Sequence, residues 1–439
     1  MREAGVIKTL KNRHYMRKII ITLVMLLTAF SADAQTVTRE QYRERVLGYS
    51  QQLAISREHV TSAEAAIKAA QVGFKPKVDA AADFNYMVKR INLELGTYGI
   101  PMKHETWGLN ATAAQNVYAG GAVRKQVEAA RIGAEQAGYG VMQTEDNVIY
   151  AAELSYWSMA TAIAYRDAAY RYLSIIEDTY EIVNNRFEDG LISRNDLLMV
   201  QTRLQEARLR VSDAETGYTQ ALIAMNTLMG MPVDKPVAIA DSINTALPPL
   251  PEILSLEEAL EARPDYMIAE SNVRLGEQQL KLTRSRYLPS LAVGFTGQYA
   301  TKSINIDGKG VGNGIAFAQL RVPIFNWNER KHKSAIDKSA IRISEEELSA
   351  AADEVARQMN DAYTRMTASY NDIETARGSV EVAQQSLSLN TFSYNEGLLT
   401  ILDVLSAQLS WLSAYNNLIA TNYNCRQAIA DYMLATGRL

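Results

Sequence analysis

The sequence predicts a mainly α-helical chain that also carries strands of membrane-spanning length, arranged as two copies of one unit. Gly190 and Gly397 lie 207 positions apart in matching segments, and so do Asp196 and Asp403. A repeat of this size must be recognised before a fold is assigned, because each half of the chain then forms the same unit. Helical periodicity and strand-like alternation also follow one another in the same order in both halves.

The first 34 residues have the pattern of a signal peptide. Arg17 and Lys18 precede an apolar run over 19–30, and the small residues Ala32 and Ala34 offer a cleavage site before residue 35. Met16 is a second candidate for the true start. The apolar run is too short for a stable membrane-spanning helix, which needs about 20 residues, so a membrane anchor is the weaker interpretation. Cleavage would change the net charge from −4 to −8. An acidic exported chain argues against nucleic-acid binding.

The predicted repeats cover residues 35–235 and 253–439, and a proline-rich crossover over 236–252 joins them. Proline interrupts helices and central strands, so neither is expected in the crossover. Cys425 is the only cysteine, which leaves no intrachain disulfide to stabilise an exported chain. The chain must therefore be held together by the burial of apolar side chains and by contacts between copies of the chain.

Each half is expected to open with a capped helix. Thr38–Gln41 forms a capping-box pattern before a helix to about Gly73, and Ser255–Glu258 forms another before a helix to about Tyr287. We expect a kink at Arg263–Pro264 in the second of these helices, because proline inside a helix removes a backbone hydrogen bond.

Two strands follow in each half, over 78–86 and 109–118 and then over 291–299 and 316–325. Apolar and polar residues alternate in all of them. Each has roughly the 10 residues that a tilted strand needs to span an outer membrane. A half-buried sheet of a soluble protein gives the same alternation, so the pattern leaves both interpretations open. The glycine-rich segment 308–314 is expected to be an external loop, because it does not open a helix as a phosphate-binding loop would.

Two very long helices are expected over 122–188 and 328–395. Each would be on the order of 100 Å long at 1.5 Å per residue. Such a helix cannot bury an apolar stripe alone. The first and last helices of each half together match its long helix in length, so we expect them to pack end to end along it as a hairpin.

The long helices end in two similar turns. A glycine ends the helix in the left-handed conformation, a leucine packs back on the last turn, and a hydroxyl residue and an aspartate cap the next helix. The positions are Gly190, Leu191, Ser193 and Asp196 in the first copy and Gly397, Leu398, Thr400 and Asp403 in the second. Helix capping, which also suits the helix dipole, is a sufficient explanation for both aspartates.

The repeat, the segment Pro323-Ile-Phe-Asn-Trp-Asn328, the two turns and the export signal resemble the TolC-like outer-membrane efflux proteins over nearly all of the mature chain. The resemblance implies a homotrimer in which each chain gives four strands to a shared twelve-stranded barrel, since a membrane does not tolerate open sheet edges. It implies long coiled-coil hairpins that form a periplasmic cylinder. The location would be the cell outer membrane, with lipid around the barrel and a periplasmic extension.

The resemblance also implies a function. The chain would be a passive exit channel for small molecules, working with a periplasmic adaptor protein and an inner-membrane pump, and it would be neither an enzyme nor a cofactor-binding protein. The two turns would dock the adaptor. Asp403 would form a gate at the periplasmic entrance, with Tyr394 as a constriction and Asp196 at an outer gate. Ser406 stands where a second entrance aspartate can occur, and Leu399 where a basic residue can occur.

Two alternatives remain open at this stage. The exported cargo could be a secreted protein, which would make the chain the exit duct of a type I secretion system. The chain could instead be a soluble periplasmic coiled-coil adaptor or scaffold. A metal enzyme is not expected, because the four histidines are scattered without metal-ligand spacing.

Overall fold

The computed structural model describes residues 36–89, 91–96, 98–302 and 304–439, so the expected signal peptide and the alternative start at Met16 lie outside the described residues. The chain divides into two compact units. One holds the residues up to Tyr49 together with 151–249 and 369–427, and the other holds 50–150, 250–368 and 428–439. Each repeat contributes to both units, so the repeats and the compact units are different divisions of the chain.

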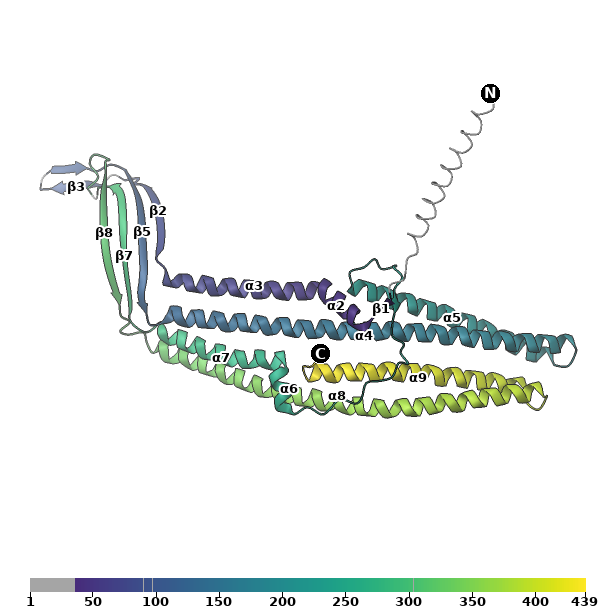
Figure 1. Cartoon of the computed structure of the whole chain (residues 1–439). Coiled ribbons are helices and arrows are strands. Elements are labelled where there is room, and N and C mark those ends of the chain that lie inside the picture. The colour runs from purple at the N-terminus through teal and green to yellow at the C-terminus, as the bar shows by residue number, and fades with distance from the viewer. Residues whose placement is uncertain (1–35, 90, 97, 303) are drawn as a thin grey trace, which may run out of the picture. The chain divides into compact units, whose positions relative to one another are not determined.

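The second of these units holds a four-stranded antiparallel sheet (Figure 1). Its strands, in sheet order, are β2 (Lys77–Tyr86), β5 (Glu105–Ala119), β7 (Ser290–Thr301) and β8 (Gly310–Arg321). Val78 pairs with Ala113, and Ala113 pairs with Phe295. Directly paired residues point to the same face of a sheet. The expected apolar positions therefore share one face and the polar positions the other, which confirms the predicted alternation up to Asn116 in β5. A bulge between Asn116 and Tyr118 then shifts the register, so that Tyr118, and not Val117 as the alternation predicts, pairs with Leu291.

The glycine-rich segment was expected to be a loop, and this is wrong for its larger part. Strand β8 begins at Gly310 and ends at Arg321, before the expected end of the strand at Phe325. A Cβ atom at Gly310 would lie 2.6 Å from the Trp107 ring, and one at Gly314 would lie 2.9 Å from the Phe295 ring. The glycines thus leave room for aromatic rings on β5 and β7. Proline has no N–H to donate to a ladder, which ends the strand before Pro323.

A second, smaller hairpin follows β2, formed by β3 (Asn92–Leu95) and β4 (Tyr98–Pro101). Only a loop was expected between the first two large strands. Strand β5 also begins at Glu105, four residues before the expected start at Leu109.

The first helix is broken, although one continuous helix to about Gly73 was expected. Helix α2 (Arg39–Tyr49) and helix α3 (Gln51–Gln71) meet at Ser50, which has a non-helical ψ of 113°. The Ser50 hydroxyl accepts a hydrogen bond from the backbone N–H of Leu53 at 3.2 Å, so it caps the second helix. A 3₁₀ turn, η1 (Val72–Phe74), follows α3. The expected capping box at Thr38 is confirmed by its two bonds with Gln41.

The kink expected at Arg263–Pro264 is a complete break between helix α6 (Leu256–Ala262) and helix α7 (Pro264–Ser285). Pro264 is the first residue of α7, where its missing N–H costs nothing. The Arg263 guanidinium donates to both carboxylate oxygens of Asp265, at 2.8 and 2.6 Å. The capping box at Ser255 and Glu258 is present as predicted.

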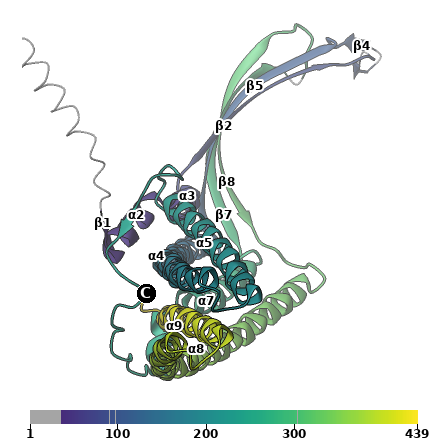
Figure 2. The ribbon, with the colours of Figure 1, turned by 90° about the vertical axis from the view of Figure 1, so that its right-hand side faces the viewer.

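The long helices α4 (Ala122–Glu188) and α8 (Glu329–Asn395) are confirmed at 67 residues each. In the first unit, the end of α4 forms an antiparallel hairpin with α5 (Arg194–Leu228), and the end of α8 forms another with α9 (Ile401–Ala435), as Figures 1 and 2 show. One apolar cluster draws on both hairpins, with members from Tyr172 to Leu412. Among the helices within the described residues, none holds an apolar stretch long enough to cross a bilayer.

The crossover between the repeats packs into the same unit as the hairpins, up to Pro249. Strand β1 (Thr36–Val37) pairs in parallel with β6 (Ala238–Ile239). Arg426, which is 7% exposed, lies over the Trp157 ring and donates to the backbone carbonyl of Thr245 at 2.6 Å. A buried arginine thus fixes the part of the crossover that follows β6.

Candidate functional site

The two turns at the ends of the hairpins are closed by the same pair of backbone hydrogen bonds. In the first turn, Gly190 N–H donates to the carbonyl of Phe187 and Leu191 N–H donates to that of Arg186, both at 2.9 Å. In the second turn, Gly397 and Leu398 make the equivalent bonds, at 2.9 and 2.8 Å. The φ angles of the two glycines are +73° and +78°, a region that glycine enters at little cost. Both glycines therefore end their helices.

The aspartates cap the helices that follow the turns. Asp196 accepts from the backbone N–H of Ser193 at 3.3 Å, and its own N–H donates to the Ser193 hydroxyl at 3.2 Å. Asp403 accepts from the Thr400 hydroxyl at 2.6 Å and from the Thr400 N–H at 3.0 Å. The hydroxyl bond, and then the backbone bond, hold the pKa of the Asp403 carboxyl below its usual range. Asp403 is therefore anionic at neutral pH.

The two aspartates differ in exposure. Asp403 is exposed to solvent, whereas Asp196 is half-buried. One Asp403 carboxylate oxygen, Oδ2, accepts both bonds from Thr400. This geometry lets the carboxylate cap the helix and still present its charge to the surroundings of the second turn.

Arg186, which was not predicted as a site residue, joins the two hairpins next to their turns. Its guanidinium donates to the carbonyls of Tyr394 and Asn395, at 3.1 and 2.8 Å, and lies 4.7 Å from the centre of the Tyr394 ring. The repeat places Ser393 at the position that corresponds to Arg186. The contact is therefore formed once in each chain. A difference in charge between matched repeat positions, just before a helix-ending glycine, is the signal that could have revealed it.

Tyr394 was expected to be a constriction residue, but the structure places its side chain inside the apolar cluster. The residue is 6% exposed, and its hydroxyl has no hydrogen-bond partner within the described part of the chain. In a single chain, the ring is covered by Arg186 and by the cluster. Its position is that of a packing residue between the hairpins.

Exposed leucines surround the two turns. Leu191 is 71% exposed and Leu398 is 74% exposed, so the expected packing of these two side chains against the preceding turn is wrong. Ile192 packs against the apolar cluster in the first turn, and Ile401 is buried in the second. Leu402, which was not among the predicted site residues, adds another exposed side chain beside the second turn. Each turn thus presents exposed leucine to its surroundings, which is the kind of apolar surface that a protein partner can cover.

A family model described as "Outer membrane efflux protein" matches residues 43–231 and 255–438. The two matched segments lie one in each repeat. Together they cover most of the chain.

Curated relatives are distant in sequence. The chain is 22% identical to "Protein CyaE" of Bordetella pertussis over 294 residues, which is 65% of this chain and 61% of that protein. It is 24% identical to "Alkaline protease secretion protein AprF" of Pseudomonas aeruginosa over 275 residues, 60% of this chain and 54% of that protein. The match to "Probable efflux pump outer membrane protein TtgC" of Pseudomonas putida is 24% identical over 176 residues, 39% of this chain and 35% of that protein. The chain thus spans less than two thirds of the length of each of these relatives.

Solved structures match over most of both chains. A structure of CusC superposes with a TM-score of 0.78 at 18% identity, covering 91% of this chain and 92% of that chain. The Campylobacter jejuni CmeC outer membrane channel superposes with a TM-score of 0.77 at 16% identity, covering 91% and 85%. At these identities the likeness establishes the fold, which is the mainly helical fold with four large strands that the sequence predicts.

Proposed function

The chain belongs to the outer membrane efflux protein family, and from this premise we propose that it is the passive exit channel of a tripartite efflux system. It resides in the cell outer membrane, extends into the periplasm and carries small molecules outward. The chain performs no catalysis and needs no cofactor in this role. The energy for transport comes from an inner-membrane pump.

The observation that carries this proposal is the sheet, whose paired residues sort apolar and polar side chains onto opposite faces. Strands β2 and β8 each have one unpaired edge. Unpaired backbone groups are too costly in a bilayer, so the edges need partners. Three copies that join edge to edge supply them and form a twelve-stranded barrel, with the apolar face toward lipid.

The hairpin turns are the site at which the channel meets its adaptor. Leu191 and Leu398 give each turn an exposed apolar side chain, and Gly190 and Gly397 fix the backbone that presents them. Ser193 and Thr400 hold the start of the following helices. A rigid turn with an exposed leucine suits a helical groove on a periplasmic adaptor protein, because little entropy is lost on binding.

Asp403 is the gate residue of the periplasmic entrance. Its exposure and its lowered pKa keep a negative charge at the second turn, and three copies form a ring that attracts cations. Because Asp196 is half-buried, we assign it only to capping the helix that follows the first turn. Because Tyr394 is buried, we assign it to holding the hairpins together and not to lining the pore.

A second candidate function is the exit duct of a protein-secretion system. The match to the relative named as an alkaline protease secretion protein covers 60% of this chain, against 39% for the one named as a probable efflux pump protein. The soluble scaffold considered from the sequence is not favoured, because the family is one of outer-membrane proteins.

The full exported chain, purified in detergent, tests the channel. Native mass spectrometry should give three copies, and planar bilayers should show steady ionic conductance. A monomer without conductance would contradict the proposal.

Deleting the gene shows which of the two classes of cargo the chain exports. Accumulation of fluorescent pump substrates in the cell identifies efflux, whereas retention of a secreted protein with normal dye export identifies secretion.

A further inference from the structure

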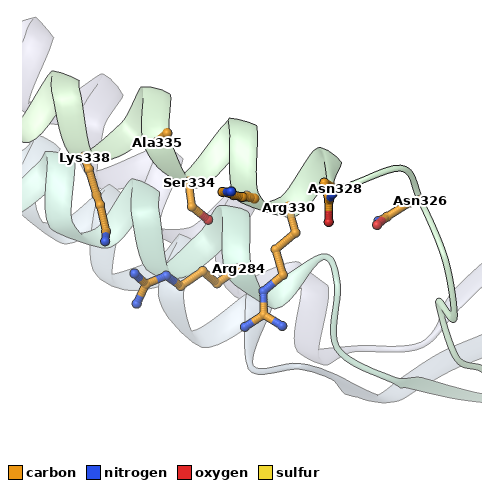
Figure 3. Close-up of a pocket in the computed structure, with 8 residues that line it drawn as sticks. Arg284, Asn326, Asn328, Arg330, Ser334, Ala335 and Lys338 are labelled. Atoms are coloured by element: carbon orange, nitrogen blue, oxygen red, sulfur yellow. The ribbon is translucent and has the colours of Figure 1, made fainter.

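A groove lined by basic side chains lies where α7 ends and α8 begins (Figure 3). Its volume is about 650 Å³. The residues that matter for its chemistry are Arg284 on α7, Arg330, Lys331, Ser334 and Lys338 on α8, and Asn328 just before α8. Figure 3 shows Arg284, Arg330 and Lys338 extending from the two helices around the same space.

The basic residues of the groove are unpaired. Within the described residues, Arg284, Arg330, Lys331 and Lys338 form no ion pair and no side-chain hydrogen bond, and all four are exposed. Lys333, on the same turn of α8, does pair with Glu329, at 2.7 Å. Like charges gathered around one hollow repel each other, and a bound anion relieves that repulsion. The positive end of the α8 dipole adds to the same potential.

Exposed apolar side chains separate the groove from the end of β8. Ile324 is 94% exposed, Phe325 is 72% exposed and Trp327 is 84% exposed. Aromatic side chains of this kind are enriched where a protein surface passes from lipid to water. The groove therefore lies beside a short apolar segment at the point where the sheet ends and the helices begin.

Trp327 is held in an unusual backbone conformation. Its φ is +49° and that of Asn328 is +59°, and the matching positions of the first repeat are Gly120 and Gly121, at +62° and +77°. The second repeat thus retains a bulky aromatic residue where the first uses glycine. A left-handed conformation is unfavourable for a residue with a side chain, and such strain persists where another interaction requires the residue.

We propose that this groove binds the phosphate of an anionic glycerophospholipid, with Phe325 and Trp327 against the apolar part of the same lipid. The inference rests on the proposed function, which places the sheet in the outer membrane. Guanidinium groups bind phosphate oxygens in bidentate geometry, so Arg284 and Arg330 hold the headgroup. Lys338 adds charge, and Asn328 and Ser334 supply neutral donors.

The test compares the wild-type chain with a groove variant that combines Arg284→Gln, Arg330→Gln and Lys338→Gln. A control variant combines Arg57→Gln, Arg208→Gln and Arg210→Gln, which removes the same charge from exposed arginines for which the structure shows no ion pair. Each full exported chain is titrated in mixed micelles with fluorescent phosphatidylglycerol and, separately, with phosphatidylcholine. Inorganic phosphate is the competitor that distinguishes a lipid from a free ion.

We expect wild-type chain and control variant to prefer phosphatidylglycerol. The groove variant should bind phosphatidylglycerol about a hundredfold more weakly at low salt, because it lacks three of the basic side chains. A variant with Arg284→Lys and Arg330→Lys should lose less, because charge remains while bidentate geometry is lost. Equal loss in groove and control variants would overturn the proposal. So would displacement by inorganic phosphate at equal affinity, which would assign the groove to a free anion.

The proposed channel function and the proposed lipid site in the groove can be contradicted separately. Normal conductance in bilayers, with no preference for phosphatidylglycerol over phosphatidylcholine, would overturn the groove assignment and leave the channel standing. Binding that depends on the groove in a chain without conductance would support the groove and contradict the channel.

Discussion

Arg186 lies over the ring of Tyr394 and donates a hydrogen bond to the carbonyl of the same residue, at 3.1 Å. Arg186 is in the last turn of α4 and Tyr394 in the last turn of α8. The guanidinium thus satisfies carbonyls at the C-terminal end of a helix, where the helix dipole favours positive charge. Because Ser393 replaces the arginine in the other repeat, the contact distinguishes two hairpins that otherwise end alike.

Arg186→Ala should loosen the two hairpins next to their turns. We expect the free energy of unfolding to fall by about 1–2 kcal/mol, since two hydrogen bonds from a partly exposed charged group are lost. If the turns form the entrance, the mean conductance in planar bilayers should also rise. Arg194→Ala is the matched control, because Arg194 is exposed at the start of α5 and the structure shows no ion pair for it. Equal effects of both substitutions would show that the contact with Tyr394 does not hold the hairpins.

Replacing the helix-ending glycines should destabilise the chain, whereas replacing a glycine inside a helix should not. Gly190→Ala and Gly397→Ala each place a side chain at positive φ, which costs about 1–2 kcal/mol. Gly378→Ala lies inside α8 with open space around its Cβ position and should stabilise by about 0.5–1 kcal/mol. The thermal unfolding midpoint should therefore fall for Gly190→Ala and Gly397→Ala and rise for Gly378→Ala. A fall for Gly378→Ala would indicate that another copy occupies that space.

The elements most firmly predicted from sequence are those with a local physical cause. The long helices, the caps at Ser193 and Ser255 and the stops at Gly190 and Gly397 follow from periodicity and capping chemistry, which act within a few residues. The break at Ser50 was missed, because a serine in a periodic helical pattern shows no boundary until its hydroxyl is seen to cap Leu53.

Features that depend on distant residues could not be derived in this way. The start of β8 at Gly310 depends on rings from other strands, and the role of Arg186 depends on carbonyls about 200 residues away. The positive φ of Trp327 was also hidden, although the repeat aligns it with Gly120. Comparing the repeats position by position would have shown a tryptophan where the first repeat has a glycine. Only the structure shows that both residues have a positive φ.

Arg426→Met should destabilise the packing of the crossover. The substitution removes the contact with Trp157 and the hydrogen bonds to the carbonyls of Ile243 and Thr245, and it leaves both carbonyls without the Arg426 donor. We expect a loss of about 2–4 kcal/mol and faster proteolysis within 240–249. Arg365→Met is the control, because Arg365 is 63% exposed and its 3.8 Å ion pair with Asp431 should contribute less than about 1 kcal/mol. Unchanged proteolysis in the Arg426 variant would mean that other contacts fix the crossover.

Asp403→Asn separates the capping role of this residue from its charge. The amide oxygen can still accept from Thr400 but carries no charge, so the unfolding midpoint should fall only slightly, while block of conductance by a trivalent cation should weaken severalfold. Asp196→Asn makes the same change in the first repeat and should leave the block unaltered. Equal block in wild type and the Asp403 variant would restrict Asp403 to helix capping.

The pH dependence of the cation block also tests whether the Asp403 carboxylate carries the charge. The Thr400 hydroxyl lowers the pKa of Asp403, so its charge and the stability that its bonds contribute are present at neutral pH. Both are lost only as the pH falls through that lowered pKa, below the ordinary aspartate value of about 3.9. Thr400→Val removes the hydroxyl, which raises the pKa of Asp403 toward its ordinary value. Cation block should then disappear at a higher pH than in wild type, and identical pH profiles would mean that a different group carries the charge.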